Sequence, residues 1–361
     1  MTAAGQILVG EIAHGGPIPF RRFMEVALYH PQHGYYRRRA DPFGIGGDFY
    51  TAEQLQPVFG LLMAARIRQL AAAMGNPADF TVVELGAGRR EMATAFSEWR
   101  YVPVDIDCGQ LPRRFRGVVF ANEFFDALPV DVAIARQGKL LEQRVGFRDG
   151  RFHWETAGPV PAEVEQYLRR YAALPAGKRD DGENDADTAR EGVPMEANIE
   201  ALGWIERIAG ALEDGYLFAV DYGYTRAEAA RFPRGTLMSY RRHMAREDVL
   251  ENPGEQDITA HVNFTALEEH GRRHGLVRES FQTLTRTVLE AGEADQFASV
   301  LSATDAREAL RRRMQLKTLL VGMGETFRVL LARREKAGKG KKRLKHFGPK
   351  MKKAPETGAL E

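Results

Sequence analysis

The feature that most constrains this chain is a short apolar run that ends in an acid and two glycines. Residues 80–83 form a β-rich segment, and Glu84-Leu85-Gly86-Ala87-Gly88 follows directly. Glycines at a strand end let backbone N–H groups approach a ligand that side chains would block. Asp105 comes about 20 residues later, where an acid can accept both ribose hydroxyls. The run therefore predicts a βαβ unit that holds a nucleoside-like ligand.

Glu84 indicates which nucleotide this turn suits. An acid two residues before the first glycine repels a pyrophosphate, but it attracts a ligand that carries a positive sulfonium and ammonium. We therefore predict S-adenosylmethionine as the cofactor, with Glu84, Gly86 and Gly88 at its methionyl part and Asp105 at its ribose. A dinucleotide site and a strand-to-helix turn without a ligand are the alternatives.

Further strands are predicted at Gly117 to Asn122 and at Gly215 to Asp221. Both are apolar on successive residues, which is typical of strands covered on both faces of a parallel sheet. Both end in polar or acidic residues, and open α/β sheets bind ligands at the carboxyl ends of their strands. With a helix predicted from about Arg90 to Trp99, the pattern indicates an α/β, Rossmann-like class I methyltransferase fold.

The sequence as a whole predicts three regions, the second of which contains an insertion. Residues 1–75 form an N-terminal helical region over the cofactor, with helices at 20–29 and from about 53 to 74. Residues 76–332 form the methyltransferase core, and an insertion at about 135–195 holds a hairpin at Asp149-Gly150 and a loop from Pro175 to Gly192. A helix is predicted from Glu196 to Leu212. Residues 333–361 form a basic tail, which we expect to be disordered.

The segment from Asn122 to Pro129 begins at the end of the strand predicted at Gly117 to Asn122 and carries the candidate catalytic groups. Asn122 is predicted to hold a cofactor or substrate group. Glu123 and Asp126 can clamp a guanidinium through charge-assisted hydrogen bonds, or raise each other's pKa so that one acts as a general base. Asp126 is also expected to cap a helix that begins at Ala127, with Pro129 in its first turn, and this capping is the alternative to a chemical role for it.

Weaker candidates lie in two other segments. Asp48, Phe49 and Thr51 end a glycine-rich stretch and are predicted to contact the cofactor. His261 lies in the polar run from Gly254 to Phe264 and is either a general base or a hydrogen-bonded structural histidine. No His, Cys or carboxylate spacing predicts a metal site, and neither a nucleophile elbow nor a P-loop is present.

Composition limits the class of protein. The chain has 361 residues, 44% hydrophobic and 28% charged, as in ordinary soluble globular proteins. No apolar run approaches the roughly 18 residues that span a bilayer, so we expect no membrane insertion. The N-terminus lacks the pattern of a secretory signal. The single cysteine, Cys108, excludes an internal disulfide framework, so we predict a cytoplasmic location.

The net charge of +2 is unevenly spread. From Arg333 to Lys353 there are eleven Lys or Arg residues against one acid, Glu335. This tail is either a solvated extension or a weak nucleic-acid contact, because clustered cations release counterions from phosphates. Phe347 is its only aromatic residue, so base stacking would be poor.

Together these segments resemble the MidA/DUF185 family of S-adenosylmethionine-dependent methyltransferases. The resemblance covers about residues 5–332 and depends most on Asn122 to Val130 and Gly254 to Phe264, with support from Glu84 to Gly88. It implies the activity of the eukaryotic relative, a mitochondrial complex I assembly factor that methylates a protein arginine. The expected acceptor is therefore an arginine nitrogen of a partner protein.

Two features depart from the family pattern and keep other functions open. Arg90 stands where the family has the last glycine of E-L-G-P-G-R-G, and the stretch from Glu91 to Phe120 is shorter than in the family. The alternatives are a catalytically weak or inactive assembly factor that binds a partner protein, and a methyltransferase of a small molecule or nucleic acid. The sequence predicts no oligomeric state.

Overall fold

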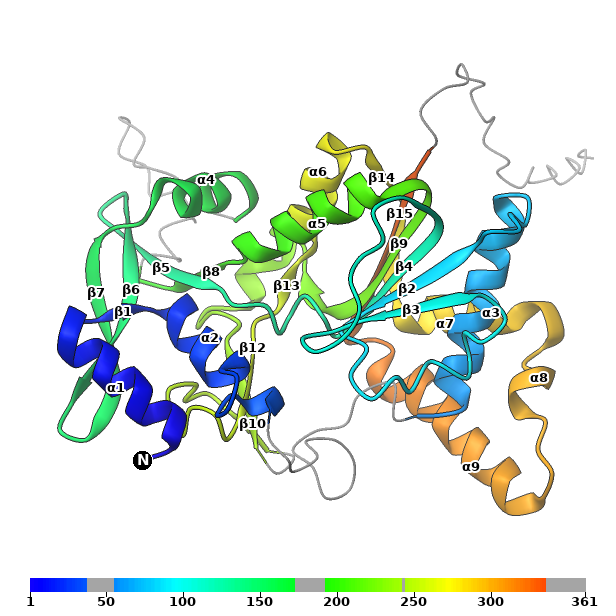
Figure 1. Cartoon of the computed structure of the whole chain (residues 1–361), viewed down its shortest axis with the longest axis horizontal. Helices are drawn as coiled ribbons and strands as arrows, with labels where there is room; N and C mark the ends of the chain where they lie inside the picture. The colour runs from blue at the N-terminus through cyan, green and yellow to red at the C-terminus, as the bar shows by residue number, and fades with distance from the viewer. Residues whose placement is uncertain (38–54, 173–191, 242–243, 336–361) are drawn as a thin grey trace, which may run out of the picture.

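The computed structural model shown in Figure 1 describes residues 1–37, 55–172, 192–241 and 244–335. Three of the predicted cofactor contacts, Asp48, Phe49 and Thr51, lie outside these ranges. So do most of the loop predicted from Pro175 to Gly192 and the tail after Glu335.

The central sheet is parallel on one side and antiparallel on the other. Its strands are β2 (Thr81–Leu85), β3 (Arg100–Val104), β4 (Phe115–Asn122), β9 (Leu212–Tyr224), β13 (Val262–Asn263), β14 (Leu276–Thr283) and β15 (Phe327–Arg334). They run in the order β14-β15-β9-β4-β2-β3, with β13 beside β9. β3, β2, β4 and β9 are parallel neighbours, whereas β15 returns antiparallel between β9 and β14. The parallel half confirms the predicted Rossmann-like core.

Helices cover both faces of this sheet (Figure 1). One face packs against α3 (Val58–Ala73), α7 (Leu284–Gly292), α8 (Ala298–Leu301), α9 (Ala306–Lys317) and the π-helical η6 (Thr318–Met323). The other face packs against α5 (Ile199–Ala211) and α6 (Phe264–Arg273). In β4, Val118 and Phe120 point to the first layer while Val119 and Ala121 point to the second. Burial on both faces explains why these strands are apolar on successive residues.

A second sheet joins the N-terminal helices to the segment after β4. It runs β1-β6-β5-β8 with β7 on β6, and its strands are β1 (Ile18–Pro19), β5 (Asp131–Arg136), β6 (Lys139–Arg148), β7 (Arg151–Pro159) and β8 (Pro194–Ala197). The helices α1 (Ala3–Gly15), α2 (Phe20–Tyr29) and α4 (Ala162–Tyr171) pack on it. Asp149 and Gly150 both have positive φ, which suits a two-residue hairpin turn and confirms the predicted hairpin. The helix predicted at residues 20–29 is also confirmed.

A small third sheet, β11-β10-β12, lies between these two units. Its strands are β10 (Met238–Arg241), β11 (Met244–Arg246) and β12 (Asp257–Thr259), and short 3-10 turns complete the fold at η1 (Tyr35–Arg37), η4 (Arg226–Arg231) and η5 (Glu293–Asp295). Tyr240 of β10 is the cross-strand partner of Asp257 in β12. This pairing brings two polar residues to the candidate site described below.

Two predicted helices differ from the structure. Residues 91–98 form consecutive turns in place of the predicted helix, and Arg90, which precedes them, has a left-handed backbone conformation (φ 60°). Met92 and Phe96 still lie on one side and are fully buried. The helix predicted from Glu196 begins at Ile199, because Glu196 pairs with Val132 as part of β8.

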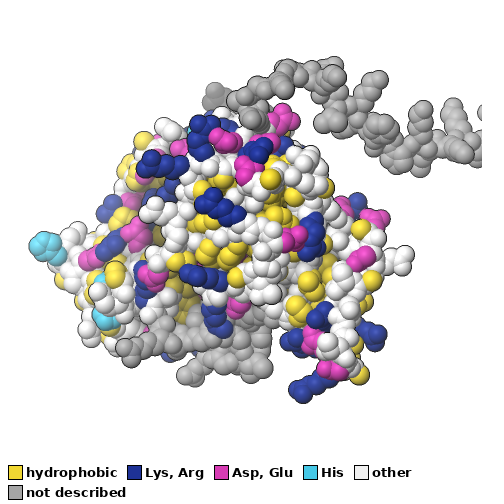
Figure 2. Space-filling model, turned by 45° about the vertical axis from the view of Figure 1, so that its right-hand side comes forward, with side chains coloured by type: hydrophobic (Ala, Val, Ile, Leu, Met, Phe, Trp, Pro, Cys, Tyr) yellow, Lys and Arg dark blue, Asp and Glu magenta, His cyan; other side chains and the backbone are white. Residues whose placement is uncertain are grey.

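The surface seen in Figure 2 mixes charge types. Basic side chains are spread among acidic and apolar ones on this face. Within the described ranges, none of the helices has both the length and the apolar character needed to cross a bilayer.

Candidate functional site

The glycine turn lies at the carboxyl end of β2. Gly86 and Gly88 have φ of 70° and 46°, a left-handed conformation that favours glycine. A Cβ on Gly86 would lie 3.1 Å from the ring of Phe124, so the turn also packs closely. Glu84 is fully buried in β2 and accepts a hydrogen bond from the Tyr101 hydroxyl. The turn therefore presents backbone directly above a buried carboxylate.

Asp105 follows β3 and lies beside the glycine turn. Its Oδ2 accepts a hydrogen bond from the Gly88 N–H (2.5 Å), and its Oδ1 accepts one from the Ile106 N–H (2.6 Å). The Gly86 N–H in turn donates to the Val104 carbonyl (2.9 Å). These bonds hold the ends of β2 and β3 together, so the structure brings the predicted acid and the predicted glycines to one place.

Asn122 occupies the same edge of the sheet, one strand further along. Leu85 pairs with Ala121 in the parallel register, so Gly86 and Asn122 both follow the last paired residues. The Asn122 amide nitrogen donates to Glu123 Oε1 (3.3 Å). Its amide oxygen is buried and accepts no hydrogen bond from the described residues. A buried acceptor without a donor costs about 1–3 kcal/mol, so this oxygen fits the ammonium group of a bound ligand.

Glu123 adopts an uncommon backbone conformation. Its φ is 48°, and its N–H donates to the Val220 carbonyl in β9 (2.9 Å). A left-handed conformation outside glycine costs about 1 kcal/mol or more, and such strain is concentrated at functional sites. The strain turns the chain sharply at the end of β4 and leaves the Glu123 side chain half-buried at the edge of the sheet.

The helix predicted to begin at Ala127 is absent from the structure, which has turns there. The chain enters β5 at Asp131, which leaves no room for this helix. Asp221 in β9 also holds the segment, because its fully buried carboxylate accepts hydrogen bonds from the N–H groups of Phe125 (3.0 Å) and Asp126 (3.4 Å). These contacts fix the segment in turns. The prediction that Asp126 caps a helix is therefore wrong, and Asp126 is instead a buried carboxylate beside Asp221.

Four acids converge at this point, and their pKa values reflect it. Burial raises the pKa of Asp126 well above its usual range, and the charges of Asp221, Glu123 and Asp257 raise it further. Burial also raises the pKa of Asp221 to about 7, although hydrogen bonds from backbone N–H groups, with that of Phe125 the largest, oppose the shift. A buried group of carboxylates is unfavourable alone and favours a bound cation.

Tyrosines form the wall of this acidic site. The Tyr36 hydroxyl donates to Asp257 Oδ1 (2.8 Å), and the Tyr29 hydroxyl donates to the Ala127 carbonyl (2.7 Å). The rings of Tyr29 and Tyr36 lie 5.5 Å apart between centroids. Burial, followed by the nearby carboxylates, raises the pKa values of Tyr29, Tyr36 and Tyr240. These phenols therefore stay protonated and add donors and aromatic faces to the site.

His261 lies next to the segment that holds Asp126. The Ala260 N–H donates to the Asp126 carbonyl (2.9 Å), and the His261 ring stacks near Tyr222, with 6.4 Å between centroids. The Nδ1 of His261 is buried without a hydrogen-bond partner among the described residues. Burial lowers the pKa of His261, so its ring is neutral at pH 7. The two roles predicted for this histidine both stay open.

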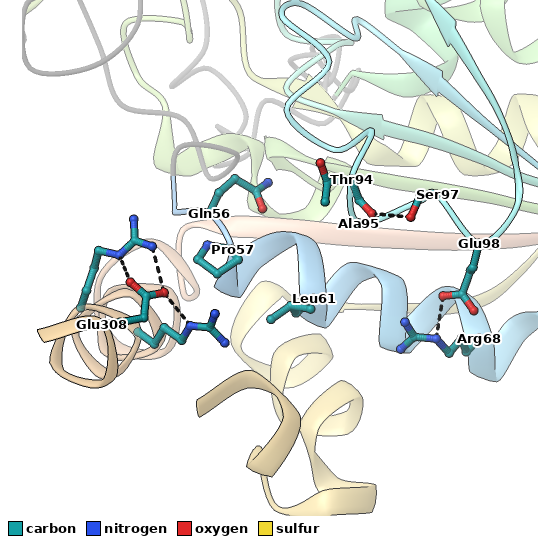
Figure 3. A pocket seen from close by; sticks show the side chains of 11 residues that line it. Gln56, Pro57, Leu61, Arg68, Thr94, Ala95, Ser97, Glu98 and Glu308 are labelled. Atoms are coloured by element: carbon teal, nitrogen blue, oxygen red, sulfur yellow. Dashed lines mark hydrogen bonds and ion pairs between the residues drawn. The ribbon is translucent and has the colours of Figure 1, made fainter. Parts of the chain in front are cut away.

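A pocket of about 620 Å³ lies elsewhere, between α3, the turns at 94–98 and α9 (Figure 3). Its charged residues are paired with each other. Glu308 contacts Arg311 and Arg312 at 2.7 Å, and Glu98 contacts Arg68 at 2.7 Å. None of the predicted site residues lines this pocket. It is therefore separate from the acidic site.

Several residues of the acidic site were not among the predicted ones. These are Tyr29, Tyr36, Asp221, Tyr240 and Asp257. The available signals were weak: Asp221 ends a predicted strand, and Asp257 lies in the polar run that also holds His261. Only the folded chain shows that they share one site.

The profile of a family described as "Putative S-adenosyl-L-methionine-dependent methyltransferase" matches residues 92–282. The chain belongs to this family. The methyltransferase is also similar to a COG1565 superfamily member from Burkholderia thailandensis, whose crystal structure contains S-adenosyl-homocysteine. The two are 30% identical, with a TM-score of 0.77 over 93% of each chain. These findings confirm the predicted fold, activity class and cofactor.

Two curated relatives carry a more detailed name. The "Protein arginine methyltransferase NDUFAF7 homolog, mitochondrial" of Drosophila melanogaster is 26% identical, and the match covers 90% of the methyltransferase and 83% of the relative. The corresponding protein of Bos taurus is 25% identical, with 90% and 81% covered. Both are named mitochondrial, so the cytoplasmic location of the methyltransferase stays a prediction.

The raised pKa of Asp221 predicts how stability changes with pH. A free aspartate has a pKa near 3.9, so between about pH 4 and pH 7 the folded methyltransferase keeps a proton that the unfolded chain has lost. The free energy of unfolding should therefore fall as pH rises across this window, by up to about 1.4 kcal/mol per pH unit from this group. Asp221→Asn should flatten the slope in urea titrations. If the free energy of unfolding changes with pH equally in the two proteins, the raised pKa of Asp221 is contradicted.

Arg90 predicts a stabilising substitution. Its side chain is exposed and its backbone is left-handed, a conformation that glycine adopts without strain. We expect Arg90→Gly to raise the free energy of unfolding by about 0.5–1 kcal/mol, because relief of strain exceeds the added entropy of the unfolded chain. Urea unfolding of both proteins measures this difference. Lower stability in the glycine variant would mean that the arginine side chain makes a contact worth more than the strain.

Proposed function

We propose that the methyltransferase transfers a methyl group to a side-chain nitrogen of an arginine in a partner protein. The observation that carries the proposal is the group of four carboxylates, Asp126 with Glu123, Asp221 and Asp257, at the end of β4. A guanidinium presents five N–H donors in a plane and can use several carboxylates at once, whereas a lysine ammonium is a single point charge. The names of the curated relatives support the same acceptor.

The cofactor belongs at the neighbouring glycine turn in this proposal. S-adenosylmethionine supplies an electrophilic methyl group on a positively charged sulfur. Glu84 is buried beneath the turn and attracts that positive charge, while the Asn122 amide oxygen can accept from the ammonium group. Asp105 now bonds to the Gly88 N–H and has lone pairs left for ribose hydroxyls. Gly86 and Gly88 keep the approach to the backbone open.

The acids of the site then have two tasks. A guanidinium is protonated in proteins, so its nitrogen is a poor nucleophile until a proton leaves. Asp126 is suited to receive that proton, because burial and the adjacent carboxylates raise its pKa and make it a better base. Glu123 and the Tyr36 hydroxyl hold the acceptor while the carbon–nitrogen bond forms and the carbon–sulfur bond breaks.

A labelled-methyl assay tests the proposal. The purified chain is incubated with methyl-labelled S-adenosylmethionine and a cell lysate, and the labelled material is identified by mass spectrometry. Label on protein arginine supports the proposal. Label on lysine, RNA or a metabolite rejects the arginine acceptor and favours the alternative substrates. No label, despite cofactor binding shown by calorimetry, would favour an assembly factor that has lost turnover.

A further inference from the structure

Three side chains of metal-ligand type meet on the outer side of the α5–α6 layer. Glu206 lies in α5, His270 lies in α6, and His274 caps the end of α6 one turn later. His270 Nε2 is 2.8 Å and His274 Nε2 is 3.6 Å from the same oxygen, Glu206 Oε1. The three ligand atoms all lie within 4.8 Å of one another. They belong neither to the acidic site nor to the glycine turn.

We propose that Glu206, His270 and His274 bind a divalent transition metal, with zinc as the metal that best fits. Two histidines four residues apart on a helix share one face, and two imidazoles with one carboxylate form an open zinc ligand set that leaves a position for water. Zinc–ligand bonds of 2.0–2.2 Å place two ligand atoms on one ion roughly 3.3 Å apart. The two distances to Glu206 are already close to this value, so binding needs only small side-chain movements.

The surroundings of His270 hold its ring in a position suited to metal binding. The Tyr171 hydroxyl lies 3.3 Å from His270 Nδ1, and only 12% of the His270 side chain is exposed. In the metal-free chain, Nε2–H donates to Glu206 Oε1. When a metal replaces this hydrogen, Nδ1 carries the ring hydrogen and can donate it to the Tyr171 oxygen. Outer partners of this kind orient metal-bound histidines and raise their basicity. The adjacent Arg207 is engaged elsewhere, because it pairs with Glu200 at 2.7 Å and covers the Trp204 ring.

A bound ion would connect two helices that are distant in sequence. Glu206 and His270 are 64 residues apart, and α5 and α6 lead respectively into β9 and out of β13, which pair with each other. A metal that binds only the folded chain stabilises it by mass action. The expected role is therefore a structural clamp behind β9, which carries Asp221, and β13, which directly follows His261, independent of methyl transfer.

The experiment uses the full chain after removal of metals with a chelator. Calorimetric titration with Zn²⁺ should show one ion per chain, and the melting temperature should rise with Zn²⁺ and stay unchanged with Mg²⁺, which prefers oxygen ligands. His274→Ala and Glu206→Gln should each weaken Zn²⁺ binding at least about tenfold. Tyr171→Phe, which keeps both histidines, should weaken it about tenfold if the tyrosine orients His270.

A second histidine pair supplies the control. The rings of His30 and His33 are stacked 5.2 Å apart, without a carboxylate completing a metal-ligand group among the described residues. His33→Ala should leave Zn²⁺ affinity and stoichiometry unchanged. The proposal is overturned if the His274→Ala and Glu206→Gln variants bind Zn²⁺ like the parent chain. It is also overturned if Zn²⁺ raises the melting temperature no more than Mg²⁺ does. Glu206, His270 and His274 would then be joined by hydrogen bonds alone.

Discussion

Replacing Glu123 by glutamine should lower methyl transfer to arginine by about 100-fold or more, the effect of losing one acid–base group. The amide keeps the size of the side chain and can still accept the hydrogen bond from Asn122. It loses the negative charge that binds a guanidinium and lowers the basicity of the site, because Glu123 helps to raise the pKa of Asp126. The melting temperature and the affinity for S-adenosylhomocysteine should stay within error of the parent values.

The measurement is the initial rate of label transfer to the arginine acceptor identified in the lysate assay. Glu98→Gln is a matched control, since Glu98 lines the separate pocket and pairs with Arg68. Its rate should equal that of the parent chain. A fully active Glu123→Gln enzyme would remove Glu123 from the mechanism, and loss of activity in Glu98→Gln alone would move the acceptor site to the pocket in Figure 3.

Asp105→Ala should weaken S-adenosylhomocysteine binding by about 1.5–3 kcal/mol, which corresponds to roughly 10- to 150-fold in affinity. The carboxylate is the predicted acceptor for the ribose hydroxyls, and it also accepts the Gly88 N–H at 2.5 Å. Its removal therefore takes away a ligand contact and loosens the turn that approaches the ligand. Isothermal titration calorimetry with the non-reactive product measures the change without turnover.

Asp79→Ala is the control for this substitution. Asp79 precedes β2 at the amino-terminal ends of the parallel strands and pairs there with Arg116. Because the amino-terminal ends of the strands are far from their carboxyl ends, the substitution should leave cofactor affinity unchanged. Equal binding by the Asp105→Ala variant and the parent chain would show that the ribose is held elsewhere. If the parent chain binds NAD in the calorimeter but not S-adenosylhomocysteine, the glycine turn is not a site for the methyl donor.

The sheet could be predicted because its strands are covered on both faces. Residues such as Val118 and Val119 face opposite helix layers, and this double burial leaves an apolar run that is visible in the sequence alone. The helix α2 was equally clear, because Phe20, Phe23, Met24 and Ala27 lie on one buried face. In both cases the local pattern and the tertiary environment demand the same residues.

The turns around the site could not be predicted because distant residues determine them. The Asp221 carboxylate accepts a hydrogen bond from the Asp126 N–H, 95 residues away, and β5 begins at Asp131, where the helix favoured by the local sequence would continue. Residues 91–98 form turns after Arg90, whose left-handed backbone angle no residue pattern displays. The proximity of Glu206 to His270 could not be predicted for the same reason, since the two residues meet only after α5 and α6 have packed.

The hydrogen bond between Tyr36 and Asp257 also sets an order of events during synthesis. The two residues are 221 positions apart, and a second bond joins Thr2 to Pro253 across 251 positions. At a synthesis rate of about 5–20 residues per second, Asp257 is added to the chain roughly 10–45 s after Tyr36. The glycine turn and Asp105 have already emerged by then. A nascent chain, or any product truncated before Asp257, therefore carries the glycine turn and Asp105 but lacks the carboxylate that the Tyr36 hydroxyl contacts.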